Sequence, residues 1–323
     1  MYNENRKVFI FMEVHVFMKR INPIRNKRGT TLVLYVITFS VIAACASIVV
    51  DIGVVAYKKA ETVKATDAAA LAGAQSILYG EENPIMTARE YLEKNGVNPD
   101  DASIELLSGN TGVKVTTKSN VNYVFAQLLG FDSTEVNAKA TAKVMAVTSV
   151  FRGIRPFAIE EQEFEFGTLY TLKEGGGSGS NGNYGCLALG GTGASNYRFN
   201  ILNGYDGELK VGDYVTTEPG NMSNPTKSSV DELIDRCNHY PQCTYSSFNS
   251  DCSRVITVVI VDDLDVNGRN RVQIRGFASF LLQAVEGQGN KCVVKGHFVK
   301  SITQGELNEA QKNYGLSGIK LTQ

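Results

Sequence analysis

The chain of 323 residues contains no tryptophan, three histidines and seven prolines. His15, His239 and His297 leave few candidates for a general base, and the sequence has no G-x-S-x-G, H-E-x-x-H or protein-kinase motif. We therefore expect no enzymatic activity and no cofactor. Lysine and arginine (32) balance aspartate and glutamate (33), and basic residues cluster only near the N-terminus, so we expect no nucleic-acid partner.

Charge is also missing from the run Thr31–Val50. Its twenty residues, at about 1.5 Å each in a helix, match the roughly 30 Å hydrocarbon core of a bilayer. Basic residues precede the run: Lys19, Arg20, Arg25, Lys27 and Arg28. By the positive-inside rule we expect a single-pass protein of the cell membrane, with a cytoplasmic N-terminus and an extracytoplasmic C-terminal region. A cleaved signal peptide is the alternative.

Four boundaries follow from this reading of the chain. Residues 1–29 form the cytoplasmic N-terminus, in which we expect translation to begin at Met18, and residues 30–56 form the transmembrane anchor. Asp51, the first charge after the apolar run, marks the outer edge of the membrane. An α+β domain occupies residues 57–148, and a β-rich extracytoplasmic domain occupies residues 154–304, followed by a tail at residues 305–323.

The anchor helix is expected to continue to Tyr79, because the segment after Tyr57 is rich in alanine and contains no proline. Small residues recur on one side of it at helical spacing: Ala65, Ala68, Ala69, Ala72 and Gly73. Such a face allows close packing, either on the chain's own first domain or on another chain.

The expected fold class is α+β. After the long helix we expect a second helix, a β-hairpin, a short amphipathic helix and a strand, at Pro84–Asn95, Ser103–Leu107 with Val113–Thr117, Val121–Leu129 and Val136–Val144. The distal region has four strand-like segments, at Gly167–Lys173, Arg254–Val261, Arg271–Leu282 and Val293–Val299. They suggest a small barrel or sandwich, with a flexible loop at Gly175–Asn183 and a strand-turn-strand at Leu209–Val215.

Six cysteines are present, of which Cys45 lies in the anchor. The other five are disulfide candidates, because an extracytoplasmic location permits oxidation: Cys186, Cys237, Cys243, Cys252 and Cys292. With five, at least one is unpaired or bonded to another chain. A zinc site formed by Cys237, His239, Cys243 and Cys252 is a second interpretation, although the segment lacks a C-x-x-C pair. Free, buried thiols are a third.

The segment Asp262–Asn270 contains half of a calcium loop. Asp263, Asp265 and Asn267 follow the D-x-D-x-N-G pattern, but position twelve is Ile274 where calcium requires a carboxylate. We therefore favour a hairpin turn at Asn267-Gly268, with calcium binding as the alternative.

Two segments resemble a known family. Residues Arg28–Ala74 combine an RG start, an apolar run, an aspartate followed two residues later by glycine, and the stretch ATDAAALAGA. They resemble the N-terminal region of TadE/TadG-like proteins of the Flp (Tad) pilus assembly system. Val113–Val144, with a strand, an LLG segment and alternating alanines, is similar to the family's second part. From Arg28 to Val144 the resemblance spans somewhat over a third of the chain.

The resemblance implies a structural or assembly component of a Tad/Flp-type pilus or secretion apparatus, whose partners are the membrane, other subunits of that apparatus or a second copy of itself. Gly29 is not followed by the glutamate of processed pilins at the fifth position, where Leu34 stands, and the D-x-S-x-S metal motif of some TadG-like members is absent. The alternative is an envelope adhesin or receptor in which the distal β-rich domain binds a ligand.

Overall fold

The computed structural model describes residues 27–80, 83–174 and 183–322, so the predicted Met18 start and nearly all of the predicted flexible loop at Gly175–Asn183 lie outside the described residues. The described residues form two compact units. The first contains the helix up to Lys59 together with Asn120–Val136, and the second contains Ala60–Ser119 and Asn137 onward.

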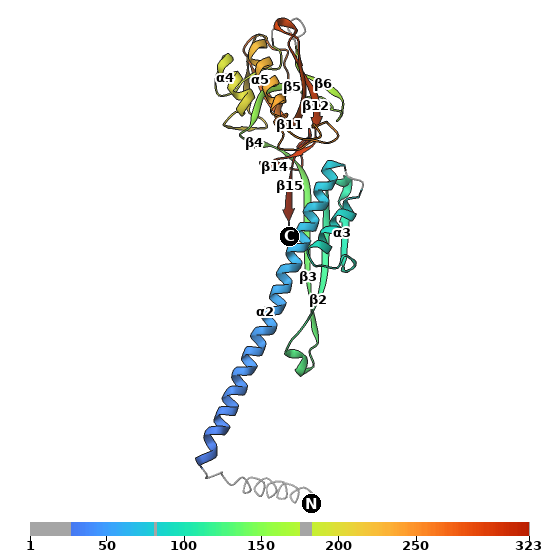
Figure 1. Cartoon of the computed structure of the whole chain (residues 1–323), viewed down its shortest axis with the longest axis vertical. Helices are drawn as coiled ribbons and strands as arrows, with labels where there is room; N and C mark the ends of the chain where they lie inside the picture. The colour runs from blue at the N-terminus through green and yellow to red at the C-terminus, as the bar shows by residue number, and fades with distance from the viewer. Residues whose placement is uncertain (1–26, 81–82, 175–182, 323) are drawn as a thin grey trace, which may run out of the picture. The chain divides into compact units, whose positions relative to one another are not determined.

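Helix α2 runs unbroken from Lys27 to Tyr79 (Figure 1). Its 53 residues correspond to about 80 Å of helix. It ends at Gly80, whose φ of 72° is a left-handed conformation that glycine adopts without strain. The part from Gly29 is long and apolar enough to cross a membrane, and its most hydrophobic stretch is not buried in the protein. The prediction of a membrane-length helix is confirmed.

Besides the helix, the first unit contains the connection between two strands of the chain. Strand β2 (Gly112–Asn122) leads into a 3₁₀ turn, η3 (Ala126–Leu129), and β3 (Ser133–Val147) follows. The amphipathic helix predicted for Val121–Leu129 is wrong, because β2 continues through Asn122 and leaves room for only a single turn.

The second unit includes a small sheet with strand order β1-β2-β3-β15-β13. Strands β1 and β2 form the predicted antiparallel hairpin, and α3 occupies the predicted second helix. The bounds not given above are α3 Pro84–Lys94, η1 Pro99–Asp101, β1 Ala102–Leu106, η2 Ser108–Asn110, β13 Ser301–Ile302, β14 Leu307–Asn308 and β15 Leu316–Thr322.

Strand β15 comes from the residues expected to form a tail. It pairs antiparallel with β3, from Ser317 opposite Ala146 to Thr322 opposite Thr141. β14 also pairs with β3. The last residues of the chain therefore complete the sheet that the first strands begin.

The distal part of the second unit contains a seven-stranded sheet with the main order β5-β10-β11-β12-β6. Its strands are β5 Ile154–Glu160, β6 Leu169–Lys173, β7 Leu187–Ala188, β9 Tyr214–Thr217, β10 Val255–Val261, β11 Arg271–Glu286 and β12 Val293–Val299, and η5 (Gly289–Lys291) precedes β12. Strands β4 (Ser149–Phe151) and β8 (Glu208–Lys210) pair separately. The segment Leu209–Val215 does turn, but β8 pairs with β4 and β9 pairs with β11, so it is not a self-paired hairpin.

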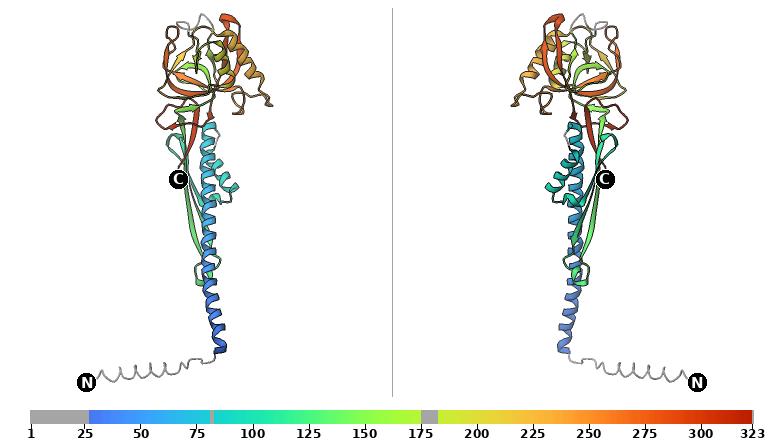
Figure 2. Two further views of the ribbon diagram at one scale, coloured as in Figure 1. Left: turned by 90° about the vertical axis from the view of Figure 1, so that its left-hand side faces the viewer. Right: turned by 90° about the vertical axis from the view of Figure 1, so that its right-hand side faces the viewer.

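Both faces of the distal sheet are buried. Helices α4 (Ala194–Asn203) and α5 (Ser223–Asp235) contribute Tyr197 and Leu233 to the core on one face. Figure 2 shows the two helices, in yellow to orange, on the same side of this sheet. On the other face, Val259 and Phe277 belong to a second core cluster. The last four residues of β10, Val258–Val261, are all apolar and fully buried, as expected of a strand that is buried on both sides.

The α+β class is confirmed, but the distal sheet does not close into a barrel. Strands β5 and β6 are the two ends of the main hydrogen-bonded order, and no register joins them among the described residues. The distal region also contains two helices that its glycine-rich and asparagine-rich sequence did not suggest.

Candidate functional site

The first candidate site is a contact between α2 and the β2–β3 connection. The Asp51 carboxylate accepts hydrogen bonds from the backbone N–H groups of Val124 (2.6 Å), Phe125 (3.1 and 3.2 Å) and Ala126 (2.8 Å). The side chain is only 6% exposed. These three amides would otherwise lack partners at the start of the 3₁₀ turn, so Asp51 fastens the connection to the helix.

Beyond this contact, the β2–β3 connection presents large apolar side chains to solvent. Leu128 is 85% exposed, Leu129 79% and Phe131 63%. These side chains belong to the same compact unit as the exposed apolar residues of α2, and Phe131 lines one hollow together with the exposed Ile52 of the helix. Contiguous exposed apolar surface of this kind indicates contact with a membrane or a protein partner. The position of Asp51 after the uncharged run predicts the end of the membrane span, but no local sequence pattern predicts its hydrogen bonds to these three backbone amides.

The small-residue face of α2 packs inside the protein. Ala65 and Ala69 are fully buried in a cluster with Val113 and Ala140, which belong to β2 and β3. A Cβ atom added at Gly73 would lie 3.1 Å from the Pro84 carbonyl oxygen, 3.1 Å from Val113 Cγ2 and 3.3 Å from Ala88 Cβ. Ala72 is 8% exposed and Ala68 is half-buried. Of the two predicted partners for this face, the structure gives the chain's own first domain.

The cysteine cluster lies between α5 and β10. Cys237, His239, Cys243 and Cys252 bring their four potential ligand atoms within 4.8 Å of one another. Burial raises the pKa of the Cys237 thiol, but hydrogen bonds from His239 and Cys252 outweigh it and lower the pKa to about 6. Burial raises the pKa of Cys252 to about 11. The pair therefore favours one thiolate, on Cys237.

The predicted disulfide bonds are not formed in the structure. All six cysteines lie among the described residues and carry free thiols. Cys186 is fully buried, with its Sγ 3.1 Å from the Tyr197 hydroxyl, and burial raises its pKa to about 11. Cys292 is also buried, and its thiol points toward the Ser223 carbonyl oxygen at 3.7 Å. Disulfide pairing stays a prediction from the compartment.

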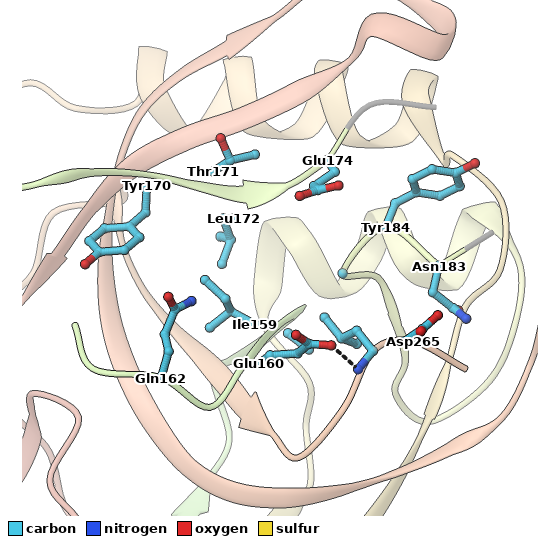
Figure 3. A pocket seen from close by; sticks show the side chains of 13 residues that line it. Ile159, Glu160, Gln162, Tyr170, Thr171, Leu172, Glu174, Asn183, Tyr184 and Asp265 are labelled. Carbon is cyan, nitrogen blue, oxygen red and sulfur yellow. Dashed lines mark hydrogen bonds between the residues drawn. The ribbon is translucent and has the colours of Figure 1, made fainter. Parts of the chain in front are cut away.

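A pocket of about 270 Å³ opens along the seam between β5 and β6 (Figure 3). Figure 3 shows Glu160 and Asp265 at one edge of it and Glu174 and Tyr184 at the other. Glu160 accepts a hydrogen bond of 2.6 Å from the backbone N–H of Leu264. The lining mixes carboxylates with apolar side chains, which suits a small polar ligand better than an apolar one.

The segment Asp262–Asn270 connects the antiparallel strands β10 and β11, but as a nine-residue loop and not as the tight hairpin turn predicted at Asn267-Gly268, because β10 ends at Val261 and β11 begins only at Arg271. The Asp263 carboxylate accepts a hydrogen bond of 2.7 Å from the Asp265 backbone N–H, while the side chains of Asp263, Asp265 and Asn267 are exposed. This arrangement is that of a turn stabilised by its own aspartates. Calcium binding remains the untested alternative.

Two histidines lie among the described residues. His239 belongs to the cysteine cluster. The imidazole of His297 has Nε2 2.7 Å from Gln283 Oε1 and Nδ1 3.0 Å from the carbonyl oxygens of Gly167 and Thr168. His297 of β12 is thus held between the side-chain amide of Gln283 in β11 and two backbone carbonyl oxygens just before β6.

Comparison of the chain with protein-family models, with curated proteins and with solved structures finds no match. Arguments about its function therefore rest on the residues and their geometry.

Proposed function

We propose that this chain is a single-pass membrane protein that serves as a structural or assembly component of a Tad/Flp-type pilus or secretion apparatus. The observation that carries the proposal is the packing between the two segments that resemble TadE/TadG-like proteins. Ala65 and Ala69 of the first segment share a core with Val113, Val115 and Ala140 of the second. The two segments that resemble the family therefore pack against each other in one helix-and-sheet arrangement. Two segments that resembled the family only by chance would not be expected to share a core.

In this proposal the helix crosses the cell membrane with its N-terminus in the cytoplasm and the region after Asp51 outside. The basic residues before the apolar run support that orientation. Leu128, Leu129 and Phe131 then lie at the extracytoplasmic surface of the cell membrane, where exposed apolar side chains can enter the lipid interface. Protease added to intact spheroplasts should digest the C-terminal region; complete protection of that region would reject the orientation.

Photocrosslinking in cells tests the assembly role. A photoreactive residue at Ile42, which is 61% exposed, or at Leu71, which is 36% exposed, should capture pilus membrane-platform or pilin-like proteins. The matched control is Ala72, which is 8% exposed and should crosslink only within the chain. The assembly role is rejected when Ile42 and Leu71 capture nothing but lipid and the chain itself.

The second candidate is a ligand-binding envelope receptor or adhesin, and the pocket between β5 and β6 favours it. Its volume of about 270 Å³ is close to the lower limit of roughly 300 Å³ for small-molecule sites. Binding of the full chain in nanodiscs to a glycan array, abolished by Glu160→Gln, would favour the receptor. An assembly component should give no signal on the array.

A further inference from the structure

The loop between α5 and β10 brings three thiols and one imidazole around a single point. The ligand atoms of the four residues lie within 4.8 Å of one another, and Cys237 Sγ is 3.8 Å from His239 Nδ1. We propose that Cys237, His239, Cys243 and Cys252 bind one Zn²⁺ ion. This site is independent of the proposed function at the membrane.

The spacing of the four ligand atoms fits tetrahedral zinc. With Zn–S bonds of about 2.3 Å and a Zn–N bond of about 2.0 Å, adjacent ligand atoms are roughly 3.5 to 3.8 Å apart. The four groups therefore need to move inward by at most about 1 Å to reach that geometry. A disulfide would join two of the sulfurs and leave the third thiol and the imidazole without a role, whereas zinc uses all four groups.

A buried guanidinium balances the charge of the site. Three thiolates, one neutral imidazole and Zn²⁺ have a net charge of −1, because −3 and +2 sum to −1. Arg254 is 6% exposed, and it donates hydrogen bonds to the carbonyl oxygens of Cys243 (2.9 Å) and Leu282 (2.7 Å). It therefore holds a positive charge beside the ligands and ties them to β11.

Four protein ligands leave no open coordination position, so the site is structural rather than catalytic. Cys243 and Cys252 pack in one core cluster with Leu281 of β11 and Val299 of β12. Zinc would thus hold the loop that follows α5 against the central strands of the distal sheet. The backbone hydrogen bonds inside this loop join near neighbours, such as Thr244 and Ser247, so a metal that cross-links Cys237 to Cys252 would stabilise the loop as a whole.

Elemental analysis of the full chain, purified in detergent without reductant or chelator, tests the proposal. We expect about one zinc per chain in the wild type and less than about 0.2 in Cys252→Ser and in His239→Ala. His239 is only half-buried, so its variant keeps the fold even where Cys252→Ser does not. Cys292→Ala, which removes a buried thiol elsewhere, should retain the metal.

Cobalt gives an independent reading. Co²⁺ added to the metal-free wild type and to Cys292→Ala should produce thiolate-to-cobalt absorption, which His239→Ala weakens. Three results overturn the proposal: a disulfide among Cys237, Cys243 and Cys252 with no bound zinc, zinc that persists in Cys252→Ser, or equal loss of zinc in the Cys292→Ala control.

Discussion

The hydroxyl groups of Thr66 and Thr117 meet inside the small helix-and-sheet core, with their Oγ1 atoms 2.7 Å apart. Both residues are fully buried. Thr66 also donates to the Thr62 carbonyl oxygen at 2.6 Å, so its proton is committed there and Thr117 donates to Thr66. The pair links α2 to β2 by a polar contact that the sequence around neither threonine predicts.

Replacing one of these threonines should cost more than replacing both. Thr66→Val leaves the Thr117 hydroxyl buried without an acceptor, and we expect the free energy of unfolding to fall by about 1 to 3 kcal/mol. The double variant Thr66→Val, Thr117→Val should recover most of this loss, because two apolar groups of similar shape then meet. Denaturant unfolding followed by circular dichroism measures both, and a double variant that loses the sum of the single losses contradicts the expected pairing.

Gly185 lies between the two ends of the distal sheet. A Cβ atom there would lie 2.8 Å from the Ala158 carbonyl oxygen in β5 and 2.9 Å from the Leu172 carbonyl oxygen in β6. Its φ is 77°, which side chains rarely adopt. Only glycine allows the chain to fill the seam between these strands.

Gly185→Ala should therefore destabilise the protein more than a change at an open glycine. Gly212 has a φ of 93° but nothing within 4 Å of its added Cβ, so Gly212→Ala carries the backbone strain alone, about 1 to 2 kcal/mol. Gly185→Ala adds the clash with two carbonyl oxygens, and we expect a further loss of about 1 to 3 kcal/mol. Thermal unfolding of the two variants measures the difference. Equal losses of stability would show that β5 and β6 move apart enough to accommodate the methyl group.

At the scale of elements, the 3₁₀ turn η3 depends on a carboxylate 75 residues before its first residue. Asp51→Ala removes the acceptor of three backbone amides, so the local opening free energy of Val124–Ala126 should fall by about 1 to 3 kcal/mol. Hydrogen exchange of these amides measures the change. Asp51→Asn, which keeps one oxygen acceptor, should give an intermediate effect.

Ser40→Ala is the control for this experiment. Ser40 lies in the same helix and bonds only the Val36 carbonyl oxygen within it, so its removal should leave the exchange of Val124–Ala126 unchanged. Unchanged exchange in Asp51→Ala would mean that other contacts hold the connection. The half-buried side chains of Tyr123 and Ala126, which lie against α2, are then the remaining candidates for that role.

At the scale of the whole molecule, the last described strand joins a sheet whose other strands come mostly from residues 102–147. β15 pairs with β3, and Leu316 is 2% exposed. Deletion of residues 316–323 should lower the free energy of unfolding by at least about 2 kcal/mol, the burial free energy of one leucine. It should also expose the edge of β3 and promote aggregation.

Unfolding midpoints and size-exclusion chromatography of the truncated chain measure both effects. The matched control is deletion of Gln323 alone, which leaves the pairs from Ser317 to Thr322 of β15 in place. A truncated chain as stable and as monodisperse as this control would show that β3 does not need its last partner.

The sequence alone determined the elements whose signals are local. An uncharged run and an alanine-rich continuation gave α2, Asn83 and Pro84 gave α3, and alternating apolar residues gave β3. Helix α5 could have been found from Val230, Leu233 and Ile234, which follow helical spacing. Periodicity and chain-breaking residues act within one or two turns, so they are readable without the fold.

Only the tertiary structure decided the rest, because each remaining feature joins residues that are distant in sequence. The Asp51 contact replaced a predicted amphipathic helix with a 3₁₀ turn, and β15 turned an expected tail into a sheet strand. The sequence already grouped Cys237, His239, Cys243 and Cys252, but only the fold shows that their four ligand atoms lie within 4.8 Å of one another. Hydrogen bonds and packing between segments that are distant in the sequence determine these features, and local sequence patterns therefore do not predict them.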